Sequence, residues 1–108
     1  MNKIYLAIPY KDDQEKSFEL ANKYAAKLMK EGNIVYSPIS HNHPIAKQEG
    51  LPRGWDFWEK FDRVYVEWCD VLCVIMKDGW ENSNGVKAEI ELAKEYSKEI
   101  KYIDIENK

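Results

Sequence analysis

The stretch Val71–Met76, VLCVIM, decides the fold that this sequence predicts. A short, unbroken apolar run of this kind is typical of a strand buried on both faces of a parallel sheet. Before it, the aromatic segment Trp55–Trp68 has the apolar spacing of a helix, and after it a second helix is expected from about Asn84 to Lys98. Strand and helix therefore alternate around VLCVIM, which indicates βαβ units.

The flanking sequence continues this alternation. Further strands are expected at Lys3–Ile8, Asn33–Tyr36 and Ile100–Ile105, and a helix from Asp12 or Asp13 to about Glu31, ended by Gly32. The segment from Ser37 to about Gly54 is rich in Pro, His, Asn and Gly and is predicted to be a long loop. Residues 1–108 are thus predicted to form a single α/β domain, a flavodoxin-like or Rossmann-like three-layer sandwich with a parallel sheet of about four to five strands.

Composition excludes several classes of function. The 108 residues carry a formal net charge of −3, with Lys and Glu interspersed, so no basic block is present to bind long nucleic acid. No apolar run approaches the roughly 18–20 residues that span a membrane, and the N-terminus does not resemble a signal peptide. Cys69 and Cys73 fit reduced thiols in a protein core. We therefore expect a cytoplasmic protein with a small-molecule ligand and neither a membrane nor a long nucleic acid as partner.

Glu89 is the most informative residue of the expected last helix. On a helical wheel at about 100° per residue, the other charged residues share one solvated arc, whereas Glu89 falls among Val86, Leu92 and Ala93. A carboxylate in an apolar stripe is costly unless it is paired, hydrogen-bonded or lines a cavity. Glu89 is therefore either a helix-end acid tied to backbone amides or an Arg, or a functional group.

Asp62 shows the same anomaly in the aromatic helix. It lies on the wheel among Trp55, Trp58, Val66 and Cys69, away from the charged face. The alternative is a buried Asp satisfied by an indole N–H or a cap. Two misplaced carboxyl groups in one domain can divide the work of a reaction, one as nucleophile and the other as proton donor or orienting group.

Three polar segments are expected at one edge of the sheet, because each follows a strand: PYKDD (9–13), SPISHNHP (37–44) and KDGWENSNG (77–85). Ligands of open parallel sheets bind at that edge. Candidate binding residues in these segments are Pro9, Tyr10, Lys11, His43, Trp80, Ser83, Asn84 and Gly85. Trp58 and Trp80 could stack on a base, although aromatic residues at helical spacing more often belong to the core.

Ser83, Asn84 and Gly85 suit a small anion. Ser or Asn caps a helix well, a helix start offers free N–H groups, and glycine lets a ligand approach the backbone. An ordinary cap without a ligand is the alternative. His41 and His43 have no third ligand in their segment, so a phosphate contact, or an exposed position without a role, is favoured over zinc.

The residues named so far follow one another as they do in one enzyme superfamily. Tyr5 in IYLAIPY, Asp62 and Asp70 in FDRVYVEWCD, and Ser83, Gly85 and Glu89 in SNGVKAE resemble the nucleoside 2-deoxyribosyltransferases and the related deoxynucleoside 5′-monophosphate N-glycosidases. The resemblance spans most of the chain, and SPISHNHPIA with the aromatic helix is similar to a bacterial and phage branch of this superfamily. It implies a flavodoxin-like parallel sheet, no metal, no organic cofactor, and a dimer or larger homo-oligomer.

The resemblance also implies roles. Glu89 would be the nucleophile that forms a covalent glycosyl ester at the anomeric carbon of a nucleoside or nucleotide, Tyr5 would hydrogen-bond its carboxylate, and Asp62 would help the base to leave. Ser83 matches a phosphate-contacting serine of the N-glycosidases, which favours a 5′-phosphorylated substrate and hydrolysis over base transfer.

Two departures support an alternative. IPYKDD replaces the Gly-rich turn of the phosphate-binding hydrolases, and no segment corresponds to the C-terminal cover of the transferases. The alternative is a non-catalytic protein that binds or sequesters a nucleotide or a nucleotide signal. A hydrogen bond between Tyr5 and Glu89 would favour the enzyme, whereas an Arg or Lys locked onto Glu89 would not.

Overall fold

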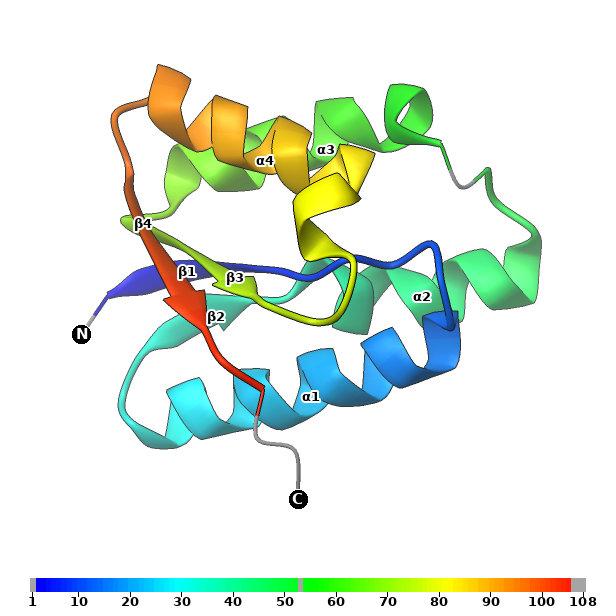
Figure 1. Cartoon of the computed structure of the whole chain (residues 1–108), viewed down its shortest axis with the longest axis horizontal. Coiled ribbons are helices and arrows are strands. Elements are labelled where there is room, and N and C mark those ends of the chain that lie inside the picture. The colour runs from blue at the N-terminus through cyan, green and yellow to red at the C-terminus, as the bar shows by residue number, and fades with distance from the viewer. Residues whose placement is uncertain (1, 53, 106–108) are drawn as a thin grey trace.

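The computed structural model describes residues 2–52 and 54–105 and shows a four-stranded, all-parallel sheet in the order β2-β1-β3-β4. Its elements, in chain order, are β1 (Lys3–Ala7), α1 (Gln14–Lys30), β2 (Ile34–Tyr36), α2 (Pro38–Glu49), α3 (Trp55–Trp68), β3 (Val71–Ile75), the 3₁₀ turn η1 (Trp80–Asn82), α4 (Asn84–Glu95) and β4 (Glu99–Ile103). Helix α1 covers one face of the sheet and α3 and α4 cover the other (Figure 1). The predicted flavodoxin-like α/β fold is confirmed.

The strand VLCVI lies inside the sheet, as its unbroken apolar sequence predicts. Every residue of β3 is buried, since β1 and β4 pair with its two edges and helices cover both faces. In β1 the side chains alternate: Ile4 and Leu6 pack toward α1, whereas Tyr5 and Ala7 pack toward α3 and α4. One strand therefore supplies both cores.

The ends of α1 follow the predicted signals. Asp13 is the N-cap, with a φ of 52°, and its Oδ1 accepts a hydrogen bond from the Lys16 N–H at 3.1 Å. The helix ends at Glu31, and Gly32 follows with a φ of 94°, a conformation that favours glycine. The cap signals thus fix where the chain turns back toward β2.

The predicted loop between Ser37 and Gly54 is wrong, because α2 fills most of it. Pro38 occupies the first turn, where its missing N–H costs nothing, and Gly50 ends the helix with a φ of 68°. Pro44 lies inside the helix, and the face that packs on α1 and β1 buries His43 rather than an aliphatic residue. The usual apolar pattern is therefore missing, and a composition typical of loops conceals a helix that tertiary contacts stabilise.

The last helix is shorter than predicted. It ends at Glu95 rather than near Lys98, and Ser97 takes a left-handed φ of 59° while the Lys98 N–H donates to the Ala93 carbonyl at 2.8 Å. The strand β4 accordingly begins at Glu99. Ser97 is one of the few non-glycine residues that adopt this conformation, so the sequence carries no strong stop signal here.

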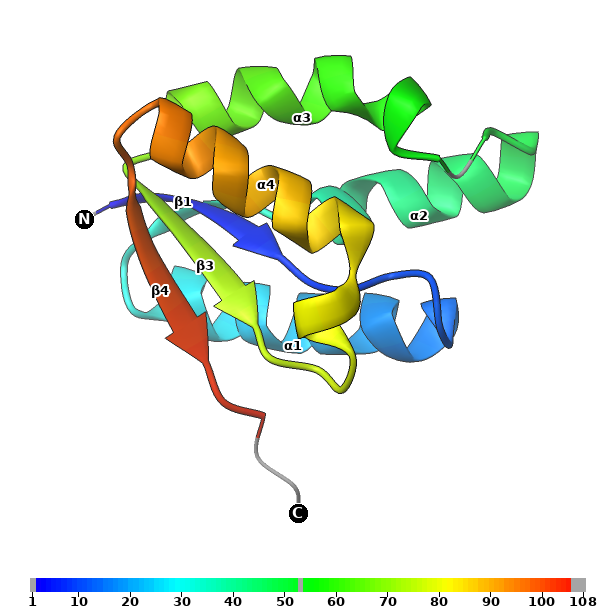
Figure 2. The same cartoon turned by 45° about the horizontal axis from the view of Figure 1, so that its top comes forward.

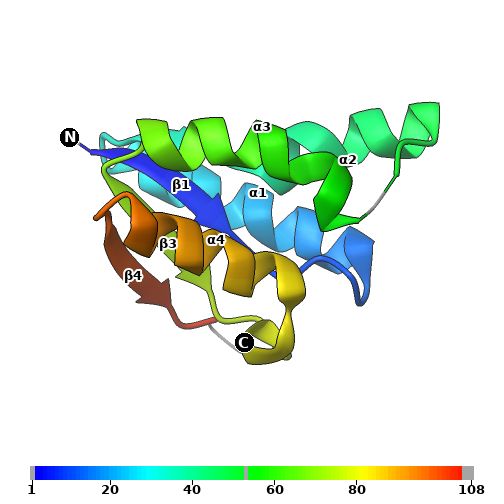
Figure 3. The same ribbon diagram turned by 90° about the horizontal axis from the view of Figure 1, so that it is seen from above.

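The carboxyl ends of the strands meet at one edge, as Figures 2 and 3 show. The chain leaves β1 and β3 toward this edge, α2 extends beyond it, and α3 and α4 lie side by side over the sheet. In the described part of the chain, no helix has the length and hydropathy needed to cross a membrane.

Candidate functional site

A cluster of three ionisable side chains lies between the sheet and its two upper helices. Tyr5 comes from β1, Asp62 from α3 and Glu89 from α4, and all three are buried, with Asp62 and Glu89 each 7% exposed. The Tyr5 hydroxyl donates a hydrogen bond to Oε2 of Glu89, across a sequence separation of 84 residues. The helical wheel predicts both inward acids correctly.

The burial of these acids follows from the helices that carry them. Glu89 shares the inner face of α4 with Val86 and Leu92, and Asp62 shares that of α3 with Val66. Their apolar neighbours hold each helix against the sheet and thereby aim the carboxyl groups at Tyr5. No Arg or Lys is paired with Glu89 among the described residues, so the Tyr5 contact is not that of a locked ion pair.

Burial shifts the proton affinity of the whole cluster. Loss of hydration raises the pKa of Glu89, and the nearby Asp62 charge raises it further, while the Tyr5 hydroxyl offsets part of the effect. Loss of hydration likewise raises the pKa of Asp62, again offset in part by Tyr5. The pKa of Tyr5 is raised well above its ordinary value by burial and by both acids. Tyr5 therefore stays protonated and acts as a donor.

One oxygen of this cluster lacks a donor. Asp62 Oδ1 is buried and has no hydrogen-bond partner among the described residues. An unsatisfied buried carboxyl oxygen costs free energy, so its presence calls for a reason, such as a ligand group that completes it. Tyr36, at the end of β2, lies near enough that burial together with the Asp62 charge raises the pKa of Tyr36 to about 12.

Tyr36 and Tyr65 form an aromatic pair beside Asp62. Their rings stack with centroids 3.8 Å apart and planes 13° from parallel, which joins the end of β2 to α3. Tyr36 also lies 6.0 Å from the Tyr5 ring. The pair thus forms one wall of the acid cluster, on the side where β2 ends.

The three polar segments at the carboxyl edge are connected, as their positions after parallel strands predict. The first segment meets the second where Tyr10 Oη lies 2.5 Å from His43 Nδ1. It meets the third where Lys77 Nζ donates to the Asp12 carbonyl at 2.6 Å and to Ser17 Oγ at 2.7 Å. Ser17 Oγ in turn donates to the Pro9 carbonyl at 2.6 Å. The first segment is therefore held on both sides.

The predicted residues at the start of α4 lie where the sequence places them. Ser83 is the N-cap and its Oγ accepts from the Val86 N–H at 3.2 Å, so its hydroxyl hydrogen can still be donated. Asn84 is exposed, and a Cβ on Gly85 would meet only Ser83 Oγ, at 4.0 Å. The backbone around Gly85 is thus open, as the predicted close approach of a ligand needs. Lys11, in the first segment, is exposed.

Three other residues named by the sequence have contacts of their own. Trp58 Nε1 donates to the Pro52 carbonyl at 2.7 Å, which fastens the connection between α2 and α3. Trp80 packs against Tyr102 of β4, with ring centroids 5.4 Å apart. Asp70, part of the resemblance, accepts from the Lys3 N–H at 2.9 Å at the start of β1, the opposite end from the carboxyl edge. None of these three contacts involves Glu89, and the ligand contacts expected of Trp58 and Trp80 stay predictions.

Sequence reasoning missed Tyr36, Tyr65, Glu15 and Lys77. Tyr36 could have been found as the last residue of a strand that points at the ligand edge. Glu15 looks like an ordinary acid in the first turn of a helix, and no local pattern shows that its carboxylate binds His43. Such partners become visible only when the helices are placed.

Two surface hollows flank the acid cluster. A groove of about 380 Å³ runs beside β2 between α1 and α2, and Tyr36 forms part of its wall. A smaller hollow of about 220 Å³ lies between α3 and α4 and is lined by Glu59, Arg63, Glu91 and Glu95 with apolar neighbours. Glu89 lines neither hollow, whereas Tyr36, which stacks on Tyr65, lines the groove.

Comparison with solved structures agrees with this architecture. A 2-deoxyribosyltransferase from Bacillus psychrosaccharolyticus superposes with a TM-score of 0.68 at 21% identity, over 98% of this chain and 74% of that one. A 2-deoxyribosyltransferase from Leishmania mexicana gives a TM-score of 0.68 at 14% identity, over 98% of this chain and 66% of that one. The fold of the 2-deoxyribosyltransferases therefore extends over nearly the whole chain.

Comparison of sequences gives the family. No curated protein sequence matches this chain. Residues 2–104 match the family described as a domain of unknown function, DUF1937. This match covers almost the entire sequence, and the chain belongs to the DUF1937 family, built on the fold of the nucleoside 2-deoxyribosyltransferases.

Proposed function

We propose that residues 1–108 act as one nucleoside 2-deoxyribosyltransferase-like domain that cleaves the N-glycosidic bond of a nucleoside or nucleotide, with Glu89 as nucleophile. The observation that carries the proposal is the buried hydrogen bond from Tyr5 to Glu89, with Asp62 beside it. A carboxylate held by a neutral phenol keeps its negative charge uncompensated and is a better nucleophile than one paired with an Arg or Lys. The shared fold supports the same reading.

The hydrogen bonding of the cluster supports different roles for the two acids. Two neighbouring buried carboxyl groups do not both ionise readily, so they share one proton at neutral pH. Because Tyr5 donates to Glu89, the negative charge is best placed on Glu89 and the proton on Asp62. Glu89 is then the nucleophile and Asp62 the acid, a division that active sites often use.

The reaction then runs in two balanced steps. The Glu89 carboxylate attacks the anomeric carbon, the carbon–nitrogen bond breaks, and the bonding pair leaves with the base, which takes the Asp62 proton. Water next attacks the same carbon, the glycosyl–Glu89 bond breaks, and the proton of the water passes to Asp62. Hydrolysis is the main outcome, and base transfer follows if a second base replaces water.

Ser83 supports a phosphorylated substrate. Its hydroxyl hydrogen is not used in capping α4, and it stands at a helix start where an anion is favoured. The open backbone at Gly85 gives a phosphate room beside it. The substrate class is therefore a nucleoside or its 5′-monophosphate.

Base release tests this function. Purified protein is incubated with ribo- and deoxyribonucleosides and their 5′-monophosphates, and free base is measured by chromatography. We expect release that Glu89→Gln abolishes and that Glu91→Gln retains, since Glu91 lies exposed on the same helix, 3.9 Å from Lys94. Base release that persists in Glu89→Gln would refute the assignment of Glu89 as the nucleophile. If no base is released while several nucleotides raise the melting temperature, the protein is the non-catalytic binding protein instead.

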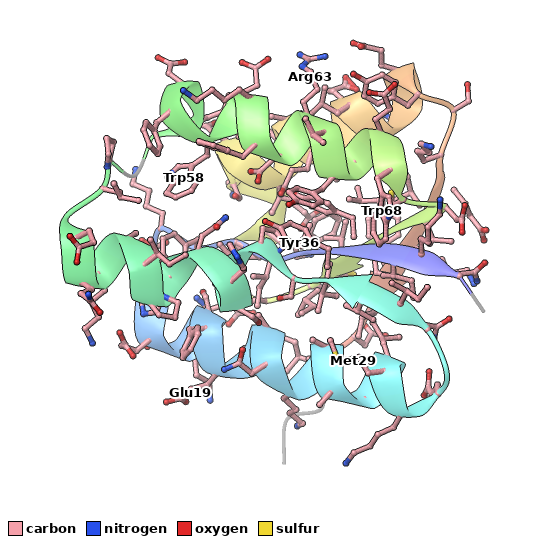
Figure 4. The ribbon with its side chains drawn as sticks, turned by 180° about the vertical axis from the view of Figure 1, so that it is seen from behind. Glu19, Met29, Tyr36, Trp58, Arg63 and Trp68 are labelled. Carbon is pink, nitrogen blue, oxygen red and sulfur yellow. The ribbon has the colours of Figure 1, made fainter. Side chains whose placement is uncertain are left out.

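We also propose that the chain forms a homo-oligomer through the face around β2. Large apolar side chains are exposed there on α1, β2 and α3: Met29, Ile34, Phe61, Val64 and Tyr65. Figure 4 shows this face, with Met29, Tyr36 and Trp68 running across it. β2 is a short edge strand, and exposed apolar side chains on the elements around such an edge favour an interface. Light scattering should show a dimer or larger assembly that Val64→Asp shifts toward monomer, while unchanged mass would refute this interface.

A further inference from the structure

A second hydrogen-bonded chain lies outside the acid cluster, at the carboxyl edge. His43 of α2 is 5% exposed, and both its ring nitrogens have partners. Nδ1 lies 2.5 Å from Tyr10 Oη, in the segment after β1, and Nε2 lies 2.7 Å from Glu15 Oε2, in the first turn of α1. The three residues therefore join three separate elements.

The groups around His43 include one ionised carboxylate and two aromatic rings. Lys47 Nζ donates to the same Glu15 oxygen at 3.1 Å. The hydrogen bonds from His43 and then Lys47 lower the pKa of Glu15, so its carboxylate is ionised. The Phe18 ring covers the imidazole at 4.8 Å between centroids, and the Tyr10 ring meets it edge-on at 5.5 Å. The charged and titratable groups that face His43 from α1 and the first segment are thus Glu15 and Tyr10.

The ionised Glu15 fixes the hydrogen positions of this chain. A carboxylate only accepts, so Nε2 of His43 always carries a hydrogen. When His43 is neutral, Nδ1 accepts and the Tyr10 hydroxyl must donate to it. When His43 takes up a proton, Nδ1–H donates to Tyr10 Oη, and the Tyr10 hydrogen turns to another acceptor. Protonation of His43 therefore reverses the direction of the Tyr10 hydroxyl.

We propose that Glu15 and His43 are positioning residues that act through Tyr10, and that the Tyr10 hydroxyl, in addition to Ser83, binds the phosphate group of a sugar phosphate with uptake of one proton by His43. A phosphate dianion accepts hydrogen bonds and donates none, so it selects the state in which the Tyr10 hydroxyl donates to the ligand rather than to His43. The ionised Glu15 compensates the imidazolium charge. The proposal deepens the proposed function, on which it rests for the nucleotide nature of the ligand.

The position of Tyr10 suits this role. It is half-buried, so part of its side chain meets solvent at the edge where the strands end. Its segment is braced by Lys77 on the other side, so binding there needs little rearrangement. Lys11 follows Tyr10 in the chain and is exposed, so the same segment carries a positive charge.

Calorimetry with 2-deoxyribose 5-phosphate tests the proposal, with 2-deoxyribose as the ligand that lacks phosphate. Neither contains a base, so no N-glycosidic bond is cleaved during the titration. Measurements at one pH in two buffers of different ionisation heat give the number of protons taken up. We expect uptake approaching one proton for the phosphate, none for the free sugar, and affinity that weakens by up to about tenfold per pH unit as the solution becomes alkaline.

Variants separate positioning from folding. His43→Gln and Tyr10→Phe should remove the proton uptake and flatten the pH profile, and Glu15→Gln should reduce both effects. His41→Gln is the matched control, because His41 is exposed on the same helix and bonds Asn42 instead. Circular dichroism at each pH confirms that every variant is folded. A merely structural His43 would change the melting temperature without removing the proton uptake.

The possible results are distinguishable from those of the proposed function. Glu89-dependent base release without proton uptake, or without any binding of the sugar phosphate, overturns this inference and leaves the glycosidase intact. Uptake that persists in His43→Gln also overturns it. Proton uptake that depends on His43, in a protein that releases no base from any nucleotide, supports it and refutes the glycosidase.

Discussion

The two faces of the central sheet use the same strands but bury different chemistry. Toward α1, the buried side chains are almost all apolar, and the buried hydroxyl of Ser17 is fully occupied by Pro9 and Lys77. Toward α3 and α4, the same β1 presents Tyr5 to two buried acids, and Asp62 Oδ1 has no partner among the described residues. The first face is built for stability, whereas the second face gives up some stability to hold reactive groups.

The sharpest contrast is expected at Glu89. Replacement by Gln keeps the size and the Tyr5 contact but removes the attacking charge, so base release should fall by about 10³-fold or more. Glu91→Gln should leave the rate within a factor of about two. Steady-state rates of both variants, with melting curves to show that each is folded, check this. Equal losses of rate in Glu89→Gln and Glu91→Gln would show that base release does not depend specifically on the buried carboxylate.

Asp62 should matter next. Asp62→Asn cannot donate an acidic proton to the leaving base, so kcat should fall by about 10²–10⁴-fold. The loss should be larger for bases that need the proton most and smaller for bases that leave readily. A panel of substrates with different leaving bases measures this dependence. A uniform loss across the panel would show that Asp62 shapes the site without giving up a proton.

The opposite behaviour is expected on the α1 face. Leu20 is buried there, and Leu20→Ala should lower the free energy of unfolding by about 2–5 kcal/mol. The rate per folded molecule at saturating substrate should not change, because Glu89 and Asp62 lie on the other face of the sheet. Denaturant unfolding and activity at low temperature check both points, with the exposed Glu19→Ala as control. A loss of rate in folded Leu20→Ala would show that the faces are coupled.

The smallest effect concerns pH. The folded-state pKa values of Glu89 and Asp62 are raised, so above the ordinary carboxyl range near pH 4 the folded protein holds protons that the unfolded chain has released. Their contribution to stability is thus full below about pH 4 and is lost as the pH rises toward the raised values. Between pH 5 and pH 9 the free energy of unfolding should fall in both proteins, and the fall should be smaller in Glu89→Gln than in the wild type by at least about 1 kcal/mol. Denaturant unfolding at each pH measures this difference. If the free energy of unfolding depends on pH in the same way in both proteins, the pKa of Glu89 is not raised.

Local patterns predict the elements and the two acids well. VLCVI reads as a buried strand because helices cover both its faces, and Glu89 and Asp62 stand out because a helix repeats every 3.6 residues. The sequence pattern does not predict α2, because its buried face carries His43 and because Pro44 lies inside the helix. The Glu15–His43–Tyr10 chain and the Tyr36–Tyr65 pair join elements far apart in sequence, and no local pattern encodes such contacts.

Covalent trapping on Glu89 tests the central claim most directly. A 2′-fluoro analogue of the substrate found by base release destabilises the positive charge on the sugar and slows hydrolysis of the glycosyl ester. Digestion with trypsin yields residues 88–94, AEIELAK, which contain both Glu89 and Glu91. We predict one added glycosyl mass whose fragment ions place it on Glu89. Base release from the analogue with residues 88–94 unlabelled, or labelled at Glu91, would contradict the account.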